Sequence, residues 1–247
     1  MVVLYKTDMT SIFQNDVRVG ILYPESDIII WYAKIPTIME SIFYKESLPD
    51  FTEVKNRLFD KKDFRQPFLN SEEIETVNGF KALKKQIEWI SGRYLVKRMI
   101  QYHFSQQNPL SEITISCLDE GAPFLTHHPD ISVSLSHSNN YTAAACCRNT
   151  KKTIGIDIEK IAKKPDAWFL KTAFTKNEIK HLEDNAGSIF KNWTLKEAYL
   201  KLIKRGFNES LHKVEVIDSK IWHNKKQIHI NVYSTFIDDY VLSLVSD

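Results

Sequence analysis

Residues 192–201 read NWTLKEAYLK, and residues 88–97 read EWISGRYLVK. Both stretches carry a Trp and a Lys eight residues apart, and a charged residue, Arg93 or Glu197, stands four positions after the Trp. A strand-like pair follows each stretch, ISVSLSHSNNYTAAACC in the first case and IHINVYSTFIDDYVLSLVS in the second. A helix and a hairpin that recur in the same order indicate duplication of one unit. We therefore expect an α+β fold of two pseudo-symmetric halves, residues 1–150 and 151–247, each an antiparallel sheet packed with helices.

The stretch around residues 190–201 predicts an amphipathic helix. At about 100° per residue, the apolar side chains fall on one stripe, formed by Leu195, Ala198, Tyr199 and Leu202. Glu197 and Lys201 lie roughly opposite this stripe. A solvated pair at this i,i+4 spacing stabilises a helix by only roughly 0.2–0.5 kcal/mol. The pair by itself therefore indicates no function.

Periodicity and turn residues predict the other elements. Helices are expected from Asn70, around 86–104, at 167–174 and at 175–184. Strands are expected at 26–35, 113–118, 131–138, 141–147, 153–159, 214–218, 228–234 and 240–246. Pro36 should end the first strand, and Gly121-Ala122-Pro123 should turn a hairpin. Residues 37–66 mix a helical pattern with Pro49 and a charged run.

Composition limits the class of protein. The 33 basic and 31 acidic residues give a net charge of +2, which is too even to favour wholesale nucleic-acid or membrane binding. The three cysteines leave an odd count without C-x-x-C spacing, which is typical neither of a disulfide framework nor of a zinc site. The N-terminal MVVLYKTDMT lacks a signal-peptide pattern, and no run approaches about 18 apolar residues. We expect a cytoplasmic protein.

The stretch TIGIDIEK (153–160) places two carboxylates on one face of a predicted strand. The three isoleucines alternate with Gly155, Asp157 and Glu159, so the isoleucines should be buried and the acids should share the other face. Their Cα atoms would be about 6.6–6.8 Å apart, and like charges at this separation repel unless a cation lies between them. Oxygen ligands without His or Cys suit Mg²⁺ or Mn²⁺. On this interpretation Gly155 leaves space for a ligand. For a D-x-E pattern alone, an exposed strand face with ordinary charges is the simpler explanation.

The stretch SLSHSNN could supply further site residues. Ser136, His137 and Ser138 stand at the end of a predicted strand, where hydroxyls and an imidazole could meet a phosphate. A surface histidine or a satisfied core group is the simpler interpretation of His137. A serine hydrolase is disfavoured because the sequence has no G-x-S-x-G elbow.

Together these motifs resemble those of the 4′-phosphopantetheinyl transferases. The resemblance rests on S-x-SHS, then GIDIE, then W-x-x-KEA-x-x-K (Trp193 to Lys201), in that order, and covers about residues 69–247. It is strongest to the large monomeric class, the surfactin-synthetase-activating type, whose members activate nonribosomal peptide and polyketide synthases or fatty-acid and lysine-pathway carriers. The family fold has two pseudo-symmetric α+β halves, which agrees with the repeat.

The resemblance implies a function and a set of site residues. It implies Mg²⁺-dependent transfer of the 4′-phosphopantetheine arm from coenzyme A to a serine of an acyl or peptidyl carrier protein, by a monomer without nucleic-acid or membrane partners. The implied metal ligands are Asp157, Glu159 and Glu197. The implied catalytic residues are Glu197, Lys201 and Glu178, and the implied coenzyme A contacts are Ser136, His137, Lys201, Lys84 and Arg93. Arg93 could equally be a structural partner within its helix.

One position departs from the family pattern. The family usually has Gly-Lys-Pro in the hairpin, whereas this chain has Gly121-Ala122-Pro123. Loss of a charge-assisted hydrogen bond costs on the order of 1.5–3 kcal/mol, so a non-catalytic homologue that binds carrier protein or coenzyme A stays an alternative. A metal-dependent nuclease is a weaker alternative, because its usual D…[ED]-x-K spacing fails where Lys160 directly follows Glu159.

Overall fold

The computed structural model describes residues 8–11, 17–43, 68–104, 108–149, 151–205 and 209–247. The helices are α1 (Ile35–Phe43), α3 (Ser71–Asn78), α4 (Leu83–His103), α5 (Ala167–Ala173), α6 (Lys176–His181) and α7 (Ala186–Leu202). The strands of the first half are β1 (Asp8–Ser11), β2 (Arg18–Glu25), β3 (Ile28–Lys34), β4 (Ile115–Cys117), β5 (Pro123–Leu125), β6 (Ser132–Ser138) and β7 (Tyr141–Cys147). Those of the second half are β8 (Ile154–Lys160), β9 (Val214–Ile217), β10 (Lys220–His223), β11 (Lys226–Ile228), β12 (Asn231–Ile237) and β13 (Tyr240–Ser246). Two 3-10 turns also lie within the described residues, Leu110–Glu112 and Leu211–Lys213.

The strands form antiparallel sheets. Their orders are β1-β2-β3-β7-β6, β12-β13-β8, β11-β10-β9 and β4-β5. In the first half, β3 pairs with β7, which also pairs with β6. In the second half, β8 pairs with β13, which also pairs with β12. Each half therefore runs through a strand, a helical segment, a small sheet and a hairpin whose last strand pairs with the first, which agrees with the predicted α+β repeat.

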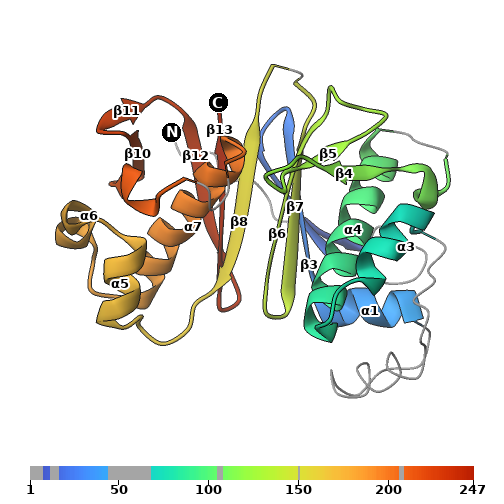
Figure 1. The fold of residues 1–247 in the computed structure, drawn as a ribbon, viewed down its shortest axis with the longest axis horizontal. Coiled ribbons are helices and arrows are strands. Elements are labelled where there is room, and N and C mark those ends of the chain that lie inside the picture. Colours follow the sequence, from blue (N-terminus) through green and yellow to red (C-terminus); the bar gives the residue numbers. More distant parts are fainter. Residues whose placement is uncertain (1–7, 12–16, 44–67, 105–107, 150, 206–208) are drawn as a thin grey trace.

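Helices cover the outer faces of two sheets that pack against each other (Figure 1). Alternate residues of β3 explain this layering: Ile29 and Trp31 pack in a core with α4, whereas Ile28 and Ile30 face the second sheet and pack with Ile156 of β8. A strand covered on both faces is apolar along most of its length, and β3 is buried from Ile28 to Ala33. The core between the sheets therefore joins the two halves.

Local chemistry explains where several elements begin and turn. Pro36 follows β3 as expected but stands in the first turn of α1, where its missing N–H costs no intrahelical bond. Asn70 caps α3 through a reciprocal pair of hydrogen bonds with Glu73. Gly121 has a φ of 87° in the turn between β4 and β5, a conformation that glycine adopts without steric cost. The expected strand at 26–35 and hairpin at 113–125 are therefore present, while residues 44–66 lie outside the described part.

A buried lysine clamps the start of α3 to α4. The ammonium group of Lys97, which is 0% exposed, donates to the carboxylate of Glu73 and to the carbonyl of Phe68. Glu73 is also the acid of the capping box formed with Asn70. One lysine thus joins a helix start, the chain before it and the long helix beside it.

The second half contains the same arrangement. Lys196 of α7 is 0% exposed and donates to Glu178 and to the carbonyl of Ala173. Glu178 is the acid of a capping box with Thr175 at the start of α6. In both halves the carbonyl belongs to the residue two positions before the cap, so the two lysines occupy equivalent places.

This equivalence corrects the register of the predicted repeat. In the predicted internal repeat, Lys97 corresponds to Lys201, because each follows a Trp by eight residues. The hydrogen bonds instead match Lys97 with Lys196. The two clamps are similar in their contacts, but the matching Trp and Lys spacing does not mark equivalent positions.

Candidate functional site

The face of β8 that carries the predicted acids packs against α7. Asp157 is buried and Glu159 is partly buried, so the alternative of an exposed strand face is wrong. A Cβ atom on Gly155 would lie 1.9 Å from the carbonyl oxygen of Ala198 in α7. The prediction that Gly155 makes room for a ligand was therefore wrong, because the helix backbone fills that space. Close packing on Gly155 brings α7 over the two carboxylates.

Asp157 receives two hydrogen bonds on one of its oxygens. The hydroxyl of Ser136 in β6 donates to Oδ1 at 2.6 Å, and the ammonium group of Lys201 in α7 lies 2.8 Å from the same atom. The other oxygen, Oδ2, is buried and has no hydrogen-bond partner among the residues that the structure describes. A buried carboxylate oxygen without a partner is costly, so Oδ2 is a candidate position for a ligand contact.

Glu159 lies two residues further along the same strand. The hydroxyl of Ser138 donates to its Oε2 at 2.7 Å. Burial raises the pKa of Glu159, and the charge of Asp157 raises it further. The two acids therefore repel each other, as the alternation in the sequence predicted.

Glu197 completes the acidic group from the facing helix. Burial and then the charge of Asp157 raise the pKa of Glu197 to about 7, and Glu159 acts in the same direction. Its Oε1 is buried without a hydrogen-bond partner. Glu197 therefore lies within electrostatic reach of both strand acids, and Lys201 is the cation that offsets part of their repulsion.

The carboxylates of Asp157, Glu159 and Glu197 are chemically suited to a hard divalent cation, but their positions do not form a metal-binding geometry. Within the described ranges, no group of three His, Cys, Asp or Glu residues has metal-site geometry. Among the described residues, one buried oxygen of Asp157 and one of Glu197 have no hydrogen-bond partner, and the acids repel each other. A bound cation would bind such oxygens and reduce the repulsion. The residues therefore fit the implied metal, with Lys201 acting as a counter-charge in its place.

His137 lies on the other side of β6 from Ser136 and faces α4. Its Nδ1 lies 3.7 Å from Oε2 of Glu88, and Glu88 also pairs with Lys84 at 3.6 Å. Partial burial lowers the pKa of His137. The charges of Glu88 and Asp157 raise this pKa, whereas those of Lys201 and Lys84 lower it. The structure thus brings His137, Lys84 and Lys201 into one electrostatic group, with Glu88 as an acid that the sequence analysis missed.

Ser136 and Arg93 have positions that differ from the predicted phosphate contacts. The Ser136 hydroxyl is buried and is engaged with Asp157, so it holds a site acid rather than facing a ligand. Arg93 is 5% exposed, stacks on Trp89 with its guanidinium 4.7 Å from the ring centroid, and donates to the sulfur of Cys117. These contacts support the structural interpretation of Arg93.

Glu178 is completely buried in a separate cluster. Its carboxylate binds Lys196 and accepts hydrogen bonds from the backbone N–H groups of Thr175 and Val216. Because both of its oxygens have partners and the side chain is 0% exposed, this placement argues against the predicted role beside an attacking hydroxyl. The equivalent pair in the first half, described above, indicates a structural role.

Two signals in the sequence bear on features that were not predicted. Ser134, Ser136 and Ser138 occupy alternate positions of SLSHS (134–138), which predicts that their hydroxyls share one face of the strand. The lysine of the KEA motif, Lys196, directly precedes Glu197, so the two side chains point in different directions on the helix.

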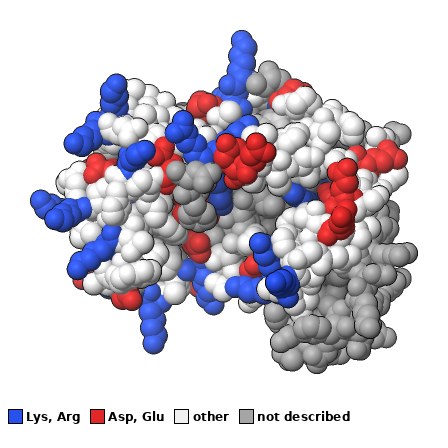
Figure 2. Space-filling view, viewed as in Figure 1, with Lys and Arg blue, Asp and Glu red and all other residues white. Residues whose placement is uncertain are grey.

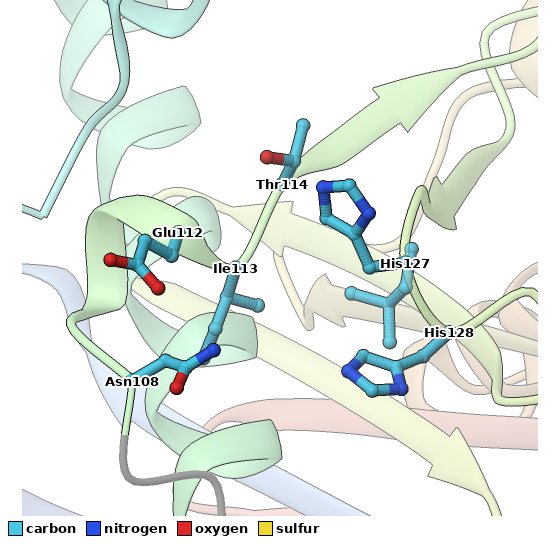
Figure 3. Close-up of a pocket in the computed structure, with 7 residues that line it drawn as sticks. Asn108, Glu112, Ile113, Thr114, His127 and His128 are labelled. Atoms are coloured by element: carbon cyan, nitrogen blue, oxygen red, sulfur yellow. The ribbon is translucent and has the colours of Figure 1, made fainter.

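A separate pocket lies beside the β4–β5 hairpin (Figure 3). It is lined by Asn108, Glu112, Ile113, Thr114, Leu125, His127 and His128. None of the predicted site residues lines it. On the face drawn in Figure 2, basic and acidic side chains are intermixed, and both border the recessed middle of the molecule. Among the described helices, none has the length and apolar character of a membrane span.

Comparisons with known proteins match the half of the chain that carries the acids. Residues 153–245 match the family model of the 4′-phosphopantetheinyl transferase superfamily. A 4′-phosphopantetheinyl transferase of Bacillus pumilus is 26% identical over 151 residues, which cover 59% of this chain and 62% of the relative. One from Aneurinibacillus migulanus is 30% identical over 118 residues, which cover 46% of this chain and 44% of the relative.

The match to a vertebrate relative covers a larger share of the chain. The L-aminoadipate-semialdehyde dehydrogenase-phosphopantetheinyl transferase of Xenopus laevis is 23% identical over 188 residues, which cover 69% of this chain and 61% of the relative. The chain therefore spans less than two thirds of the length of each of these three relatives. Residues 153–245, which include Asp157, Glu159, Glu197 and Lys201, are therefore similar in sequence to the 4′-phosphopantetheinyl transferase superfamily.

Proposed function

We propose that the protein transfers the 4′-phosphopantetheine arm of coenzyme A to a serine of an acyl or peptidyl carrier protein and releases 3′,5′-ADP. The observation that carries this proposal is the meeting of Asp157, Glu159 and Glu197 with Lys201 where β8 packs against α7. The relatives are named phosphopantetheinyl transferases, which supports the same reaction. The proposed enzyme is a cytoplasmic monomer of the surfactin-synthetase-activating type, without nucleic-acid or membrane partners.

Asp157, Glu159 and Glu197 are the proposed ligands of Mg²⁺ or Mn²⁺. Two of them offer a buried oxygen without a hydrogen-bond partner, and hard divalent cations prefer carboxylate oxygens together with substrate phosphates. A cation held there supplies charge stabilisation to the diphosphate and to its leaving oxygen. Asp157 then no longer depends on Lys201 for charge balance, so the ammonium group becomes available to the pyrophosphate.

The remaining residues bind the diphosphate and accept a proton. His137 and Lys84 lie in the same electrostatic group as Lys201, so they are the proposed contacts for phosphate oxygens. The serine oxygen of the carrier bonds to the β-phosphorus while the bond from that phosphorus to the bridging oxygen of 3′,5′-ADP breaks. The serine proton passes to a carboxylate oxygen of Glu197.

A non-catalytic homologue that binds carrier protein or coenzyme A is the second candidate. Ala122 favours it, because this residue replaces the usual hairpin lysine, and Lys84, another candidate phosphate contact, is already paired with Glu88. The two candidates predict different products from the same mixture. A catalyst modifies the carrier covalently, whereas a binding protein leaves its mass unchanged.

Intact mass spectrometry of an apo carrier incubated with the protein, coenzyme A and Mg²⁺ tests the proposal. A mass gain equal to the phosphopantetheine arm, absent with Glu197→Gln, is the expected result. Lys180→Met provides a matched control, because Lys180 is an exposed residue of α6 outside the site. An unchanged carrier mass across a panel of acyl and peptidyl carriers, with complex formation detected by gel filtration, would favour the binding protein.

A further inference from the structure

A row of serine hydroxyls joins the two sheets at the contact between β6 and β8, which we call the seam. β6 and β8 are edge strands of different sheets, and Ser134, Ser136 and Ser138 are all buried. The Ser134 hydroxyl accepts a hydrogen bond from the backbone N–H of Ile156 at 3.0 Å. Side chains of β6 thus supply partners to β8 in place of a backbone ladder.

The other two serines donate to carboxylates instead. Ser136 donates to Oδ1 of Asp157 at 2.6 Å, and Ser138 donates to Oε2 of Glu159 at 2.7 Å. A serine hydroxyl has a single proton to donate, so in each case that proton goes to a predicted metal ligand. Ser138 also accepts from the backbone N–H of Lys160 at 3.2 Å, which fixes the position of the hydroxyl itself.

These bonds leave a defined set of carboxylate oxygens for a ligand. Ser136 and Lys201 both bind Oδ1 of Asp157, while Oδ2 is buried without a partner. When Lys201 moves to a substrate phosphate, Ser136 still binds Oδ1. Ser138 binds Oε2 of Glu159 in the same way. One oxygen of each acid is therefore held from the opposite half of the molecule.

We propose that Ser136 and Ser138 are positioning residues that hold Asp157 and Glu159 in the orientation needed for a divalent cation. The inference rests on the proposed function only through the assignment of these acids as cation ligands. Hydrogen bonds to metal-ligating carboxylates orient them, and loss of such a bond typically lowers metal affinity by roughly 10- to 100-fold. Ser134 makes a similar hydrogen bond across the seam, but its partner is a backbone group of β8.

This difference provides a matched set of variants. Ser136→Ala and Ser138→Ala remove a donor from an acid, Ser134→Ala removes only a seam contact, and Ser138→Thr keeps the hydroxyl. Isothermal titration calorimetry of the full chain with MnCl2 or MgCl2, first alone and then with coenzyme A but no carrier, measures cation affinity. Thermal unfolding without cation measures the effect of each variant on the fold.

Ser136→Ala and Ser138→Ala should weaken cation binding by roughly 10- to 100-fold. Ser134→Ala should lower the Tm by a comparable amount, but its cation affinity should stay within about threefold of that of the unmodified chain. The cation affinity of Ser138→Thr should stay close to that of the unmodified chain. Equal losses in all three alanine variants, in proportion to Tm, would overturn the inference, since the serines would then only join the halves. Unchanged affinity in Ser136→Ala and Ser138→Ala would also overturn it. If the unmodified chain transfers the arm but the cation affinity of these variants is unchanged, only the serine roles are refuted. If the unmodified chain binds the cation but transfers nothing, only the proposed function is refuted.

Discussion

The ammonium group of Lys201 lies 2.8 Å from Oδ1 of Asp157 and so joins α7 to β8 at the centre of the acidic group. Its charge lowers the pKa of Glu197, although burial and Asp157 raise that pKa by more. Lys201 therefore balances charge in the chain without a cation, and in the proposed reaction it turns to the pyrophosphate. The role of Lys201 in charge balance and its proposed role in binding the pyrophosphate can be tested separately.

Replacing Lys201 with Met should weaken both the fold and the reaction. A hydrogen bond to a charged group contributes about 1.5–3 kcal/mol, so we expect the unfolding free energy without cation to fall by about 1–2 kcal/mol. Transfer should fall at least about 100-fold, the usual effect of removing a group that stabilises developing charge. Chemical denaturation and carrier modification rates measure the two effects, with Lys180→Met as control. A Lys201→Met chain with full activity would exclude the pyrophosphate role.

Glu197→Gln should make the cation-free protein more stable at pH 8. The folded pKa of about 7 lies above the usual 4.5, so the stabilising contribution is complete below about pH 4.5 and is lost as pH rises through 7. The amide carries no charge at any pH, and the gain at pH 8 is at most about 3 kcal/mol. Thermal unfolding from pH 5 to 8 measures it. Mg²⁺ should stabilise the unmodified chain but not Glu197→Gln, and equal stabilisation of both would contradict the assignment.

Glu178→Gln should reduce stability rather than chemistry. Removing one partner of a buried ion pair typically costs about 3–5 kcal/mol, and Lys196 has no exposed surface through which water could replace the carboxylate. Glu73→Gln is the matched variant, because Glu73 pairs with Lys97 in the same way. Both variants should lower the denaturation midpoint by similar amounts. The activity of the folded fraction of Glu178→Gln should stay within about threefold of normal, and a loss near 100-fold would restore the catalytic role.

Gly155→Ala should displace α7 from β8. The added Cβ would lie 1.9 Å from the Ala198 carbonyl oxygen and 2.6 Å from the Leu202 nitrogen, which are backbone atoms that cannot rotate away. Overpacking of this kind costs about 1–3 kcal/mol or more. Since α7 carries Glu197 and Lys201, transfer should fall with stability. Gly79→Ala is the control, because there the added Cβ comes no closer than 3.4 Å to its neighbours; equal stability of the two variants would show that α7 adapts freely.

His103 should make the protein sensitive to acid. Its Nε2 accepts a hydrogen bond from the indole of Trp31, and burial lowers its pKa from 6.5 to about 4, with a smaller effect of Arg148. The contribution is present above about pH 6.5 and is lost as pH falls towards 4, by up to about 3 kcal/mol. His103→Gln keeps a side-chain acceptor without titrating, so its stability should vary less over this range. The exposed His229 supplies the control variant His229→Gln, whose pH profile should match the unmodified chain.

Much of the second half could be predicted from its sequence, because its elements carry strong local signals. The isoleucines of β8 alternate with polar residues, and the apolar stripe of α7 packs as expected in one core with β9 and β10. Thr175 and Glu178 bound α6 through a capping box. The acids of the candidate site could be found for the same reason, since both elements have a regular period.

Other features depend on contacts that no local pattern records. The strands β1, β2 and β10 were not predicted, and β2 reads RVGILYPE, with Gly and Pro that weaken a strand signal. The burial of Asp157 and the tight contact at Gly155 arise only because α7 returns to β8. The clamp formed by Lys196 also joins distant segments, so the pattern of α7 alone did not predict that this lysine is buried.

Anomalous scattering from crystals grown with MnCl2 and coenzyme A tests the central claim most directly. The account predicts a single strong manganese peak bounded by carboxylate oxygens of Asp157, Glu159 and Glu197, with Lys201 on a phosphate of the bound coenzyme A. A manganese peak elsewhere, or bound coenzyme A with Lys201 still paired to Asp157 and no peak between the acids, would contradict it.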